Sequence, residues 1–252
     1  MPLAARNGVN LHIVELGAAG PPVVMLHGLL LGSLATWYFT AAQALTRRHR
    51  VLLFDLRGHG RSERPPSGYD VATHVADLGA VVSSFTDEPV ALVGHSFGAV
   101  VALRYAIHEP ARVRSLALVE APLPPSRLAE LDEFLTRPAE ERAGALPEAL
   151  RGAVLRGERG GLRLLENLRA LAEDTSLLAD LRAAEDVGDD ELARLVCPVL
   201  AVYGAASSCR PAGRRIARAA PDARLVEVEG GHFLPLEAPA ALTHLLTGFL
   251  HA

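Results

Sequence analysis

The 252-residue sequence has no block of like charge, no long apolar run and few cysteines, and each absence excludes a class of protein. Its 25 basic and 29 acidic side chains give a formal net charge of −4 and form no basic patch. Nucleic-acid-binding proteins usually carry such a patch, so we expect no nucleic-acid partner. The longest apolar stretch begins at Val23 but is interrupted by His27, Gly28 and Gly32. It is far shorter than the roughly 20 residues of a membrane span, so we expect no transmembrane helix.

The only two cysteines, Cys197 and Cys209, lie in different local contexts and not at the spacing of a metal site. We expect both to be reduced thiols with a structural role. The first 16 residues contain no apolar segment of the kind that a secretory signal needs, which predicts a cytoplasmic location.

Short aliphatic runs alternate with longer helical patterns, which is typical of βαβ units around a mostly parallel sheet. The predicted strands span residues 11–15, 23–27, 51–55, 90–94, 113–120, 199–204 and 224–229. The predicted helices span residues 36–47, 69–85, 97–109, 212–219 and 239–251. The sequence therefore predicts an α/β fold with helices flanking the sheet.

Between residues 121 and 196 the strand patterns stop, and a periodicity of Leu, Ala, Arg and Glu takes their place, interrupted by prolines. This pattern indicates a helical insertion over the sheet. We expect residues 1–120 and 197–252 to form the core domain and residues 121–196 to form a cap or lid.

A G-x-S-x-G motif at residues 94–98 follows an apolar run and opens a predicted helix, so it lies at a strand-to-helix turn. In that context the motif is typical of a nucleophile elbow, which exposes the serine above the sheet. Gly94 and Gly98 remove side chains that would collide in such a turn. We therefore predict Ser96 as the nucleophile. The free N–H groups at the start of the following helix favour a developing oxyanion.

Together with three further motifs in the expected order, this turn makes the chain resemble the α/β-hydrolases along nearly its whole length. The other motifs are His27-Gly28, the segment 55–62 and the Gly-His-Phe of 231–233. The resemblance implies an α/β-hydrolase fold with the insertion in the cap position. It also implies that the backbone N–H groups of Leu29 and Phe97 form the oxyanion hole. In segment 55–62, Asp55 and Arg57 are expected to stabilise the turn as a pair.

His232 follows the last predicted strand, where the order Ser, acid, His of this family places the base. An imidazole titrates near neutral pH, so His232 could take the proton from Ser96 and return it to the leaving group. The other nine histidines fall in motif turns, helices, strands or surface stretches. We predict that His232 is the base.

The expected acid is absent, because proteins that resemble this chain usually carry an aspartate in the loop after the strand 199–204. Here that loop contains Ser207, Ser208 and Cys209 but no carboxylate. Glu120 ends the strand before the insertion and faces the same edge of the sheet. Some relatives, including part of the haloalkane dehalogenase family, take their acid from this strand end. We predict that Glu120 orients His232.

These residues predict a serine hydrolase that cleaves an ester, thioester, lactone or carbon–carbon bond through an acyl-enzyme, without a metal or an organic cofactor. The leucine-rich residues 161–168 predict an apolar pocket and a small hydrophobic acyl substrate. Two alternatives remain open: a non-catalytic binding protein on a degenerate hydrolase scaffold, and an acyltransferase. The sequence does not indicate an oligomeric state.

Overall fold

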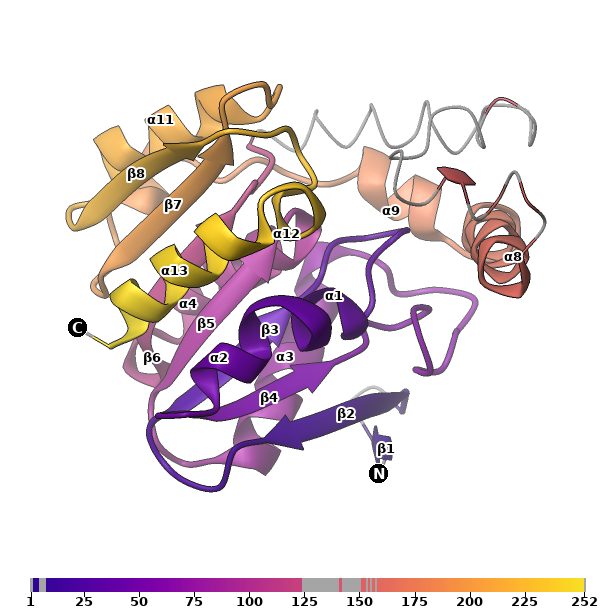
Figure 1. The fold of residues 1–252 in the computed structure, drawn as a ribbon, viewed down its shortest axis with the longest axis horizontal. Helices are drawn as coiled ribbons and strands as arrows, with labels where there is room; N and C mark the ends of the chain where they lie inside the picture. The colour runs from indigo at the N-terminus through magenta and orange to yellow at the C-terminus, as the bar shows by residue number, and fades with distance from the viewer. Residues whose placement is uncertain are drawn as a thin grey trace.

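The computed structural model describes residues 2–4, 8–123, 141, 151–152, 154, 156 and 158–251. Its strands form one eight-stranded sheet in the order β1-β2-β4-β3-β5-β6-β7-β8 (Figure 1). The strands are β1 Pro2–Ala4, β2 Asn10–Leu16, β3 Pro22–Leu26, β4 Arg50–Phe54, β5 Val90–His95, β6 Val113–Val119, β7 Val199–Gly204 and β8 Ala223–Val228. β1 and β2 are antiparallel to their neighbours, and β3 to β8 are parallel.

This sheet confirms the α/β-hydrolase fold that the sequence predicts, and each predicted strand lies within one residue of an observed one at either end. The agreement follows from burial: every residue of β3 and β5 is buried, because helices cover both faces of the sheet. Strand β8 lies at the edge, and none of its residues is fully buried. Strand β1 was not predicted, because three residues are too few to show a strand pattern.

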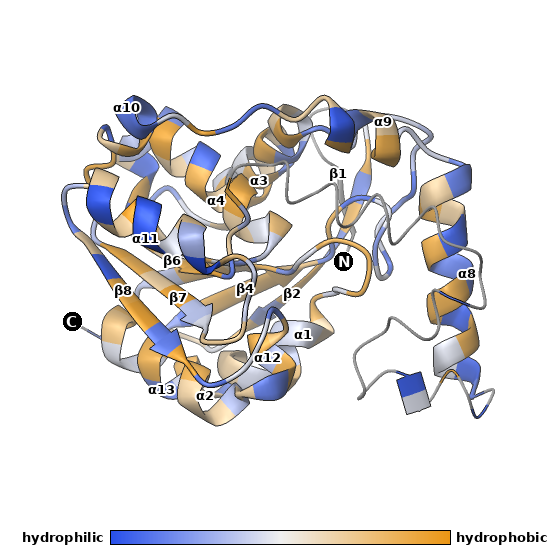
Figure 2. Ribbon diagram, turned by 90° about the horizontal axis from the view of Figure 1, so that it is seen from above, coloured by the Kyte–Doolittle hydropathy of each residue, from blue (hydrophilic) through white to orange (hydrophobic). Residues whose placement is uncertain are grey.

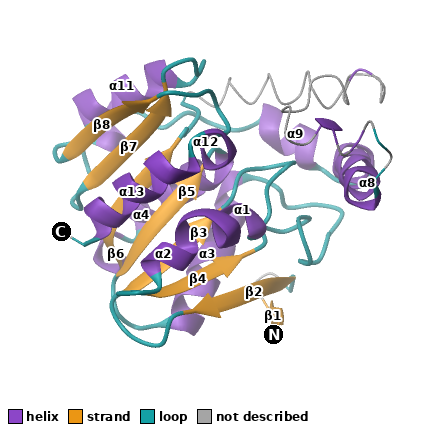
Figure 3. Ribbon diagram, viewed as in Figure 1, coloured by secondary structure: helices purple, strands orange, loops and turns teal. Residues whose placement is uncertain are grey.

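Helices pack on both faces of the sheet and enclose two apolar layers (Figure 3). One layer lies under α3 (Val71–Phe85), α4 (Phe97–His108) and α11 (Arg210–Ala219). The other lies under α1 (Ala35–Trp37), α2 (Gln43–Leu45), α12 (Leu234–Glu237) and α13 (Pro239–Leu250). Figure 2 shows the apolar strands between these helices. The rigid sheet between two packed layers fixes the ends of its strands, where the polar motifs lie.

The helical segment predicted over residues 36–47 is present but irregular, because a π-helical segment, η1 (Tyr38–Ala42), lies between α1 and α2. The Thr40 hydroxyl donates to the Thr36 carbonyl at 2.6 Å and so occupies the acceptor that an α-helical N–H would use. Beside it, the buried Trp37 donates its Nε1–H to the Leu26 carbonyl at 2.8 Å. This bond ties the irregular helix to the end of β3.

Three helices lie in the described part of the predicted cap: α8 (Arg159–Glu173), α9 (Leu177–Arg182) and α10 (Asp189–Leu192). No strand lies among the described residues of 121–196, although much of the first half of this segment is outside the described residues. Arg64, in the loop after β4, donates to Asn167 of α8 at 2.8 Å. Figure 1 shows α8 and α9 to one side of the strands, beyond the end of β4. The division into core and cap stays a prediction.

The expected pair of Asp55 and Arg57 is wrong, because each side chain has partners on other elements. Arg57 forms a buried double hydrogen bond with Asp77 of α3, at 2.7 and 2.8 Å. Asp55 lies 2.9 Å from Nδ1 of His12 and accepts from the Leu34 N–H at 2.8 Å. These contacts attach the loops after β3 and β4 to the rest of the core.

Candidate active site

Ser96 stands in the turn between β5 and α4 with φ 52° and ψ −122°, a conformation that side chains other than glycine rarely adopt. The turn is crowded on both flanks. A Cβ on Gly98 would lie 2.4 Å from the His27 carbonyl oxygen, and one on Gly94 would lie 2.5 Å from the Gly98 carbonyl oxygen. The glycines of the motif are therefore required by close packing of the backbone, and the sharp turn holds Ser96 at the end of the sheet.

His232 lies after β8, and its Nε2 is 2.9 Å from Oγ of Ser96. The loop that carries His232 is held in place by a hydrogen bond from His95, the residue before Ser96. His95 is buried, and burial is the largest cause that lowers its pKa to about 3, so its ring is neutral. The Nε2–H of His95 can then donate to the His232 carbonyl oxygen, 2.9 Å away. The structure thus brings together the two residues for which the sequence predicts nucleophile and base.

Glu120 follows β6 with φ 56° and is completely buried. Its Oε2 lies 3.2 Å from Nδ1 of His232, the distance at which a hydrogen bond is still good. The Gly204 N–H and the Ser207 hydroxyl also donate to this carboxylate. The three contacts hold the carboxylate between the ends of two neighbouring strands, and they compensate for its burial.

Cys209 is the residue at this site that sequence reasoning missed. It was expected to have only a structural role, yet its Sγ lies 3.7 Å from Nδ1 of His232. The signal was present, because Cys209 belongs to the loop after β7, in which the resemblance to the α/β-hydrolases implies an acid. Glu120, Cys209 and His232 form the one cluster among the described residues whose ligand atoms could hold a metal ion, all within 4.8 Å of one another.

The surroundings of His232 change its proton affinity. Burial lowers the pKa of the imidazole, but the hydrogen bonds and charges of Cys209 and Glu120 outweigh burial and raise the pKa to about 9. A base in this position is strong, and it holds its proton readily after taking it. The same preference means that His232 is largely protonated, and unable to accept a proton, at pH values well below 9.

Two buried histidines shape the loop after β3, which carries Leu29. His27 accepts from the Leu56 N–H at 3.0 Å, which leaves its Nδ1–H to donate to the Gly28 carbonyl at 2.8 Å. His59 accepts from the Leu30 N–H at 2.8 Å. Burial lowers the pKa of both rings, so both are neutral and can accept these bonds.

This loop lies directly against the elbow. A Cβ on Gly28 would be 3.0 Å from Cβ of Ser96, a tight contact that any larger residue could make only if its neighbours shifted. Leu29 follows Gly28, and Phe97 follows Ser96 as the first residue of α4. The structure thus holds the backbones of both predicted oxyanion-hole residues next to the candidate nucleophile, and their role stays a prediction.

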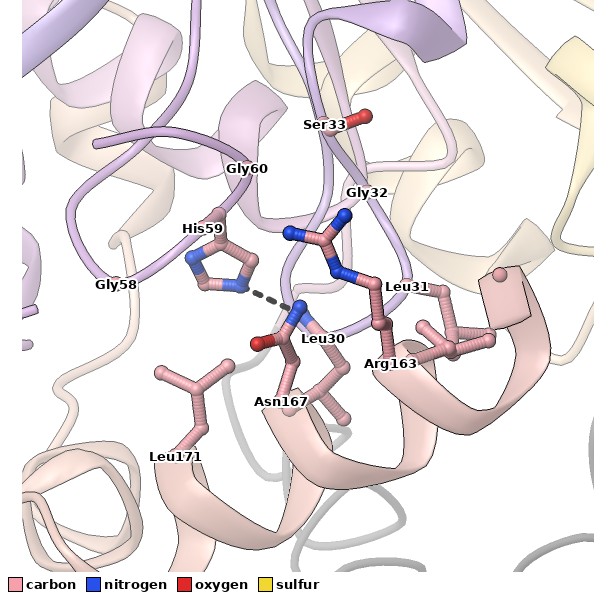
Figure 4. Close-up of a pocket in the computed structure, with 12 residues that line it drawn as sticks. Leu30, Leu31, Gly32, Ser33, Gly58, His59, Gly60, Arg163, Asn167 and Leu171 are labelled. Carbon is pink, nitrogen blue, oxygen red and sulfur yellow. Dashed lines mark hydrogen bonds between the residues drawn. The ribbon is translucent and has the colours of Figure 1, made fainter. Parts of the chain in front are cut away.

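A cavity of about 200 Å³ lies between α8 and the loops after β3 and β4 (Figure 4). Leu30, Leu31, Leu164 and Leu171 make part of its wall apolar. Arg163 and Asn167 also line it, and Figure 4 shows both reaching from α8 toward the loops. The wall is therefore mixed, less apolar than the leucine-rich sequence of α8 predicts. Separately, no helix in the described part of the chain is long and apolar enough to cross a membrane.

Comparisons with known proteins agree with this architecture. A family model described as the alpha/beta hydrolase fold matches residues 21–139. The crystal structure of a hydrolase from Pseudomonas aeruginosa matches with a TM-score of 0.82, at 27% identity, over 100% of this chain and 98% of that chain.

Two curated proteins are similar in sequence. The “Putative carbamate hydrolase RutD” of Azorhizobium caulinodans is 27% identical over 268 residues, which cover 99% of this chain and 98% of that protein. The 2-hydroxy-6-oxo-2,4-heptadienoate hydrolase of Pseudomonas putida is 40% identical over 124 residues. That match covers 48% of this chain and 44% of the Pseudomonas protein.

Proposed function

This chain is a hydrolase of the α/β-hydrolase superfamily, and on that basis we propose that it cleaves a carboxylic ester-type bond through an acyl-enzyme on Ser96. The observation that carries the proposal is the continuous relay from Ser96 through His232 to Glu120, with contacts of 2.9 and 3.2 Å. A serine is activated when a base lies within hydrogen-bond reach of its hydroxyl and a carboxylate, also within reach, orients that base.

In the first half of the reaction, His232 takes the proton of the Ser96 hydroxyl on Nε2 while Oγ forms a bond to the substrate carbonyl carbon. The carbonyl oxygen becomes an oxyanion, and the backbone N–H groups of Leu29 and Phe97 stabilise it. The bond to the leaving group then breaks, and His232 gives its proton to that group. In the second half, His232 takes a proton from water while the water oxygen forms a bond to the acyl carbon. The bond from that carbon to Oγ of Ser96 then breaks, His232 returns the proton to Oγ, and the acid is released.

Glu120 supplies the negative charge that this cycle needs. It accepts the Nδ1–H of His232, which keeps the Nε2 lone pair directed at Ser96 and stabilises the imidazolium that forms. Gly204 and Ser207 keep the carboxylate oriented. A non-catalytic binding protein was suggested by the vacant acid position after β7. That alternative loses its main support, because a carboxylate from β6 lies at the same nitrogen.

For the substrate we propose an ester, thioester, lactone or carbon–carbon bond beside a carbonyl, carried by a small hydrophobic acyl compound. The support is the apolar part of the wall of the cavity beside α8, which Leu30, Leu31, Leu164 and Leu171 form within an otherwise mixed lining. The similar proteins include one named as a putative carbamate hydrolase and one named as a 2-hydroxy-6-oxo-2,4-heptadienoate hydrolase. Acyl transfer to an alcohol or amine follows from the same acyl-enzyme and would differ only in the acceptor.

The test combines active-site labelling with a substrate panel. A fluorophosphonate probe should label the wild-type chain and the control Ser84→Ala, which changes an exposed serine on α3, but not Ser96→Ala. The panel should pair short-chain and medium-chain acyl esters, thioesters and lactones with charged esters of the same size. No labelling and no turnover would refute the proposal. Turnover of small charged esters alone would refute the hydrophobic substrate, and ester products formed from an added alcohol would indicate acyltransfer.

A further inference from the structure

Glu120, Cys209 and His232 form a three-ligand cluster in which the proposed reaction leaves the thiol unused. Sγ of Cys209 lies 3.7 Å from Nδ1 of His232, which in turn lies 3.2 Å from Oε2 of Glu120. Cys209 and Glu120 are buried, whereas the His232 side chain is 29% exposed. The cluster is therefore enclosed by protein but reachable by a small ion along the histidine.

These separations match the edges of a tetrahedral zinc site. Zinc binds nitrogen at about 2.0–2.1 Å, oxygen at about 2.0–2.2 Å and sulfur at about 2.3 Å. At tetrahedral angles these bonds hold nitrogen and oxygen about 3.4 Å apart, and nitrogen and sulfur about 3.6 Å apart. The observed 3.2 and 3.7 Å each differ from these values by about 0.2 Å or less, and the sulfur and the carboxylate oxygen lie within 4.8 Å of each other. The two edges at Nδ1 of His232 are therefore already close to those of a zinc site.

We infer that Glu120, Cys209 and His232 bind a zinc ion that reversibly inhibits the enzyme, an inference that rests on the proposed function of His232 as base. One thiolate, one imidazole and one carboxylate suit zinc, and water can fill the fourth position. Magnesium and calcium require oxygen ligands, so the thiolate and the imidazole select against them.

Zinc binding changes which nitrogen of His232 carries the proton. In the free enzyme with a neutral imidazole, the proton is on Nδ1 and Nε2 accepts from Ser96. The ion forms bonds to Sγ, to Nδ1 and to one oxygen of Glu120, and it loses the waters that these ligands replace. The Cys209 thiol releases its proton to solvent, and the Nδ1 proton is transferred to Nε2. A protonated Nε2 cannot accept the Ser96 proton, so turnover stops until the ion leaves.

The cluster is a consequence of where this chain carries its carboxylate. Glu120 reaches Nδ1 from the end of β6, so the loop after β7 is free to bring a different side chain to the same nitrogen. The Cys209 N–H donates to Oγ of Ser207 at 3.0 Å, and that hydroxyl donates to Glu120. These two bonds fix the thiol and the carboxylate relative to each other before any ion binds.

The test uses the full chain after treatment with EDTA, with Co²⁺ as a spectroscopic substitute for Zn²⁺. Wild type should develop the near-ultraviolet charge-transfer absorption of a cobalt–thiolate bond at one equivalent of Co²⁺, and Cys209→Ser should not. The matched control is Cys197→Ala, which should keep the absorption, because Cys197 is buried elsewhere and does not belong to the cluster. Ser96→Ala should also keep it, because Oγ of Ser96 is not a ligand.

Activity gives the second readout. Saturating Zn²⁺ should lower wild-type turnover at least tenfold, and EDTA should restore it. Cys209→Ser should need at least ten times more Zn²⁺ for the same fractional loss, with Cys209→Ala as the substitute if the serine variant does not fold. The inference is overturned if wild type shows no cobalt–thiolate absorption, or if both chains respond to the same Zn²⁺ concentration. Cobalt binding in a wild-type chain without turnover would refute the proposed function alone.

Discussion

Glu120→Gln is the sharpest test of the proposed acid, because it removes the charge and keeps the shape. The carboxylate is completely buried and receives the Gly204 N–H, the Ser207 hydroxyl and Nδ1 of His232. A glutamine has one carbonyl oxygen, and its NH₂ group only donates. The amide therefore cannot serve all three donors, and Nδ1 of His232 faces an amide N–H or loses its partner.

The expected loss of turnover is large. If Nδ1 accepts from the amide, Nε2 must carry the ring proton and can no longer act as the base for Ser96. In Ser-His-Asp enzymes the corresponding change of aspartate to asparagine lowers kcat by about 10⁴-fold, or about 5.4 kcal/mol of transition-state stabilisation. We expect a decrease of that order here. The fold loses only about 1–3 kcal/mol from one unsatisfied buried donor.

The assay compares kcat on the best ester of the panel with the midpoint of thermal unfolding. Glu237→Gln is the matched control, because Glu237 accepts from the Gly231 N–H beside the same histidine but has no contact with the ring among those found. We expect Glu237→Gln to keep turnover within about tenfold of wild type, because Glu237 positions the loop and takes no part in the proton transfer. A Glu120→Gln variant that is folded and also within tenfold of wild type would refute the reasoning, and the enzyme would then work with Ser96 and His232 alone.

Three further outcomes follow from the same geometry. Ser96→Ala should abolish turnover without lowering the unfolding midpoint, and more than a trace of activity in the purified variant would exclude Ser96 as nucleophile. With EDTA present, kcat/KM should rise with pH toward a plateau and reach half of that plateau near pH 9. The reason is that only neutral His232 accepts a proton, and the pKa of this imidazole is raised to about 9. A midpoint below 6.5 would contradict the raised pKa. Gly98→Ala should destabilise the fold by about 1–3 kcal/mol or more, because the new Cβ would lie 2.4 Å from the His27 carbonyl oxygen. The control Gly160→Ala should not lower the unfolding midpoint, because nothing lies within 4 Å of its new Cβ.

The parts of the fold that depend on local patterns could be predicted from the sequence. Strands β3 and β5 are buried on both faces, so their apolar runs mark them without ambiguity. Pro110 ends α4 close to the predicted point, since the helix stops at His108. The candidate Ser96 and His232 could be found for a similar reason, because glycines at fixed offsets mark the turns that carry them.

Contacts between distant segments could not be predicted in the same way. The sequence places Asp55 and Arg57 two residues apart, yet Arg57 pairs with Asp77, and Asp55 with His12. The π-helical turn depends on where the Thr40 hydroxyl donates, which no periodicity records. Neighbours in the chain are thus poor guides to partners in a packed core, where strand order decides which side chains meet.

The position of Glu120 shows how strand order brings a carboxylate from the end of β6 to a histidine that follows β8. Strands β6 and β7 are parallel neighbours, and the Glu120 N–H donates to the Val202 carbonyl at 2.9 Å, so the two strands end at the same level of the sheet. A carboxylate from either strand end can therefore reach the histidine that follows β8. The Ser207 hydroxyl, in the loop after β7, donates to the Glu120 carboxylate.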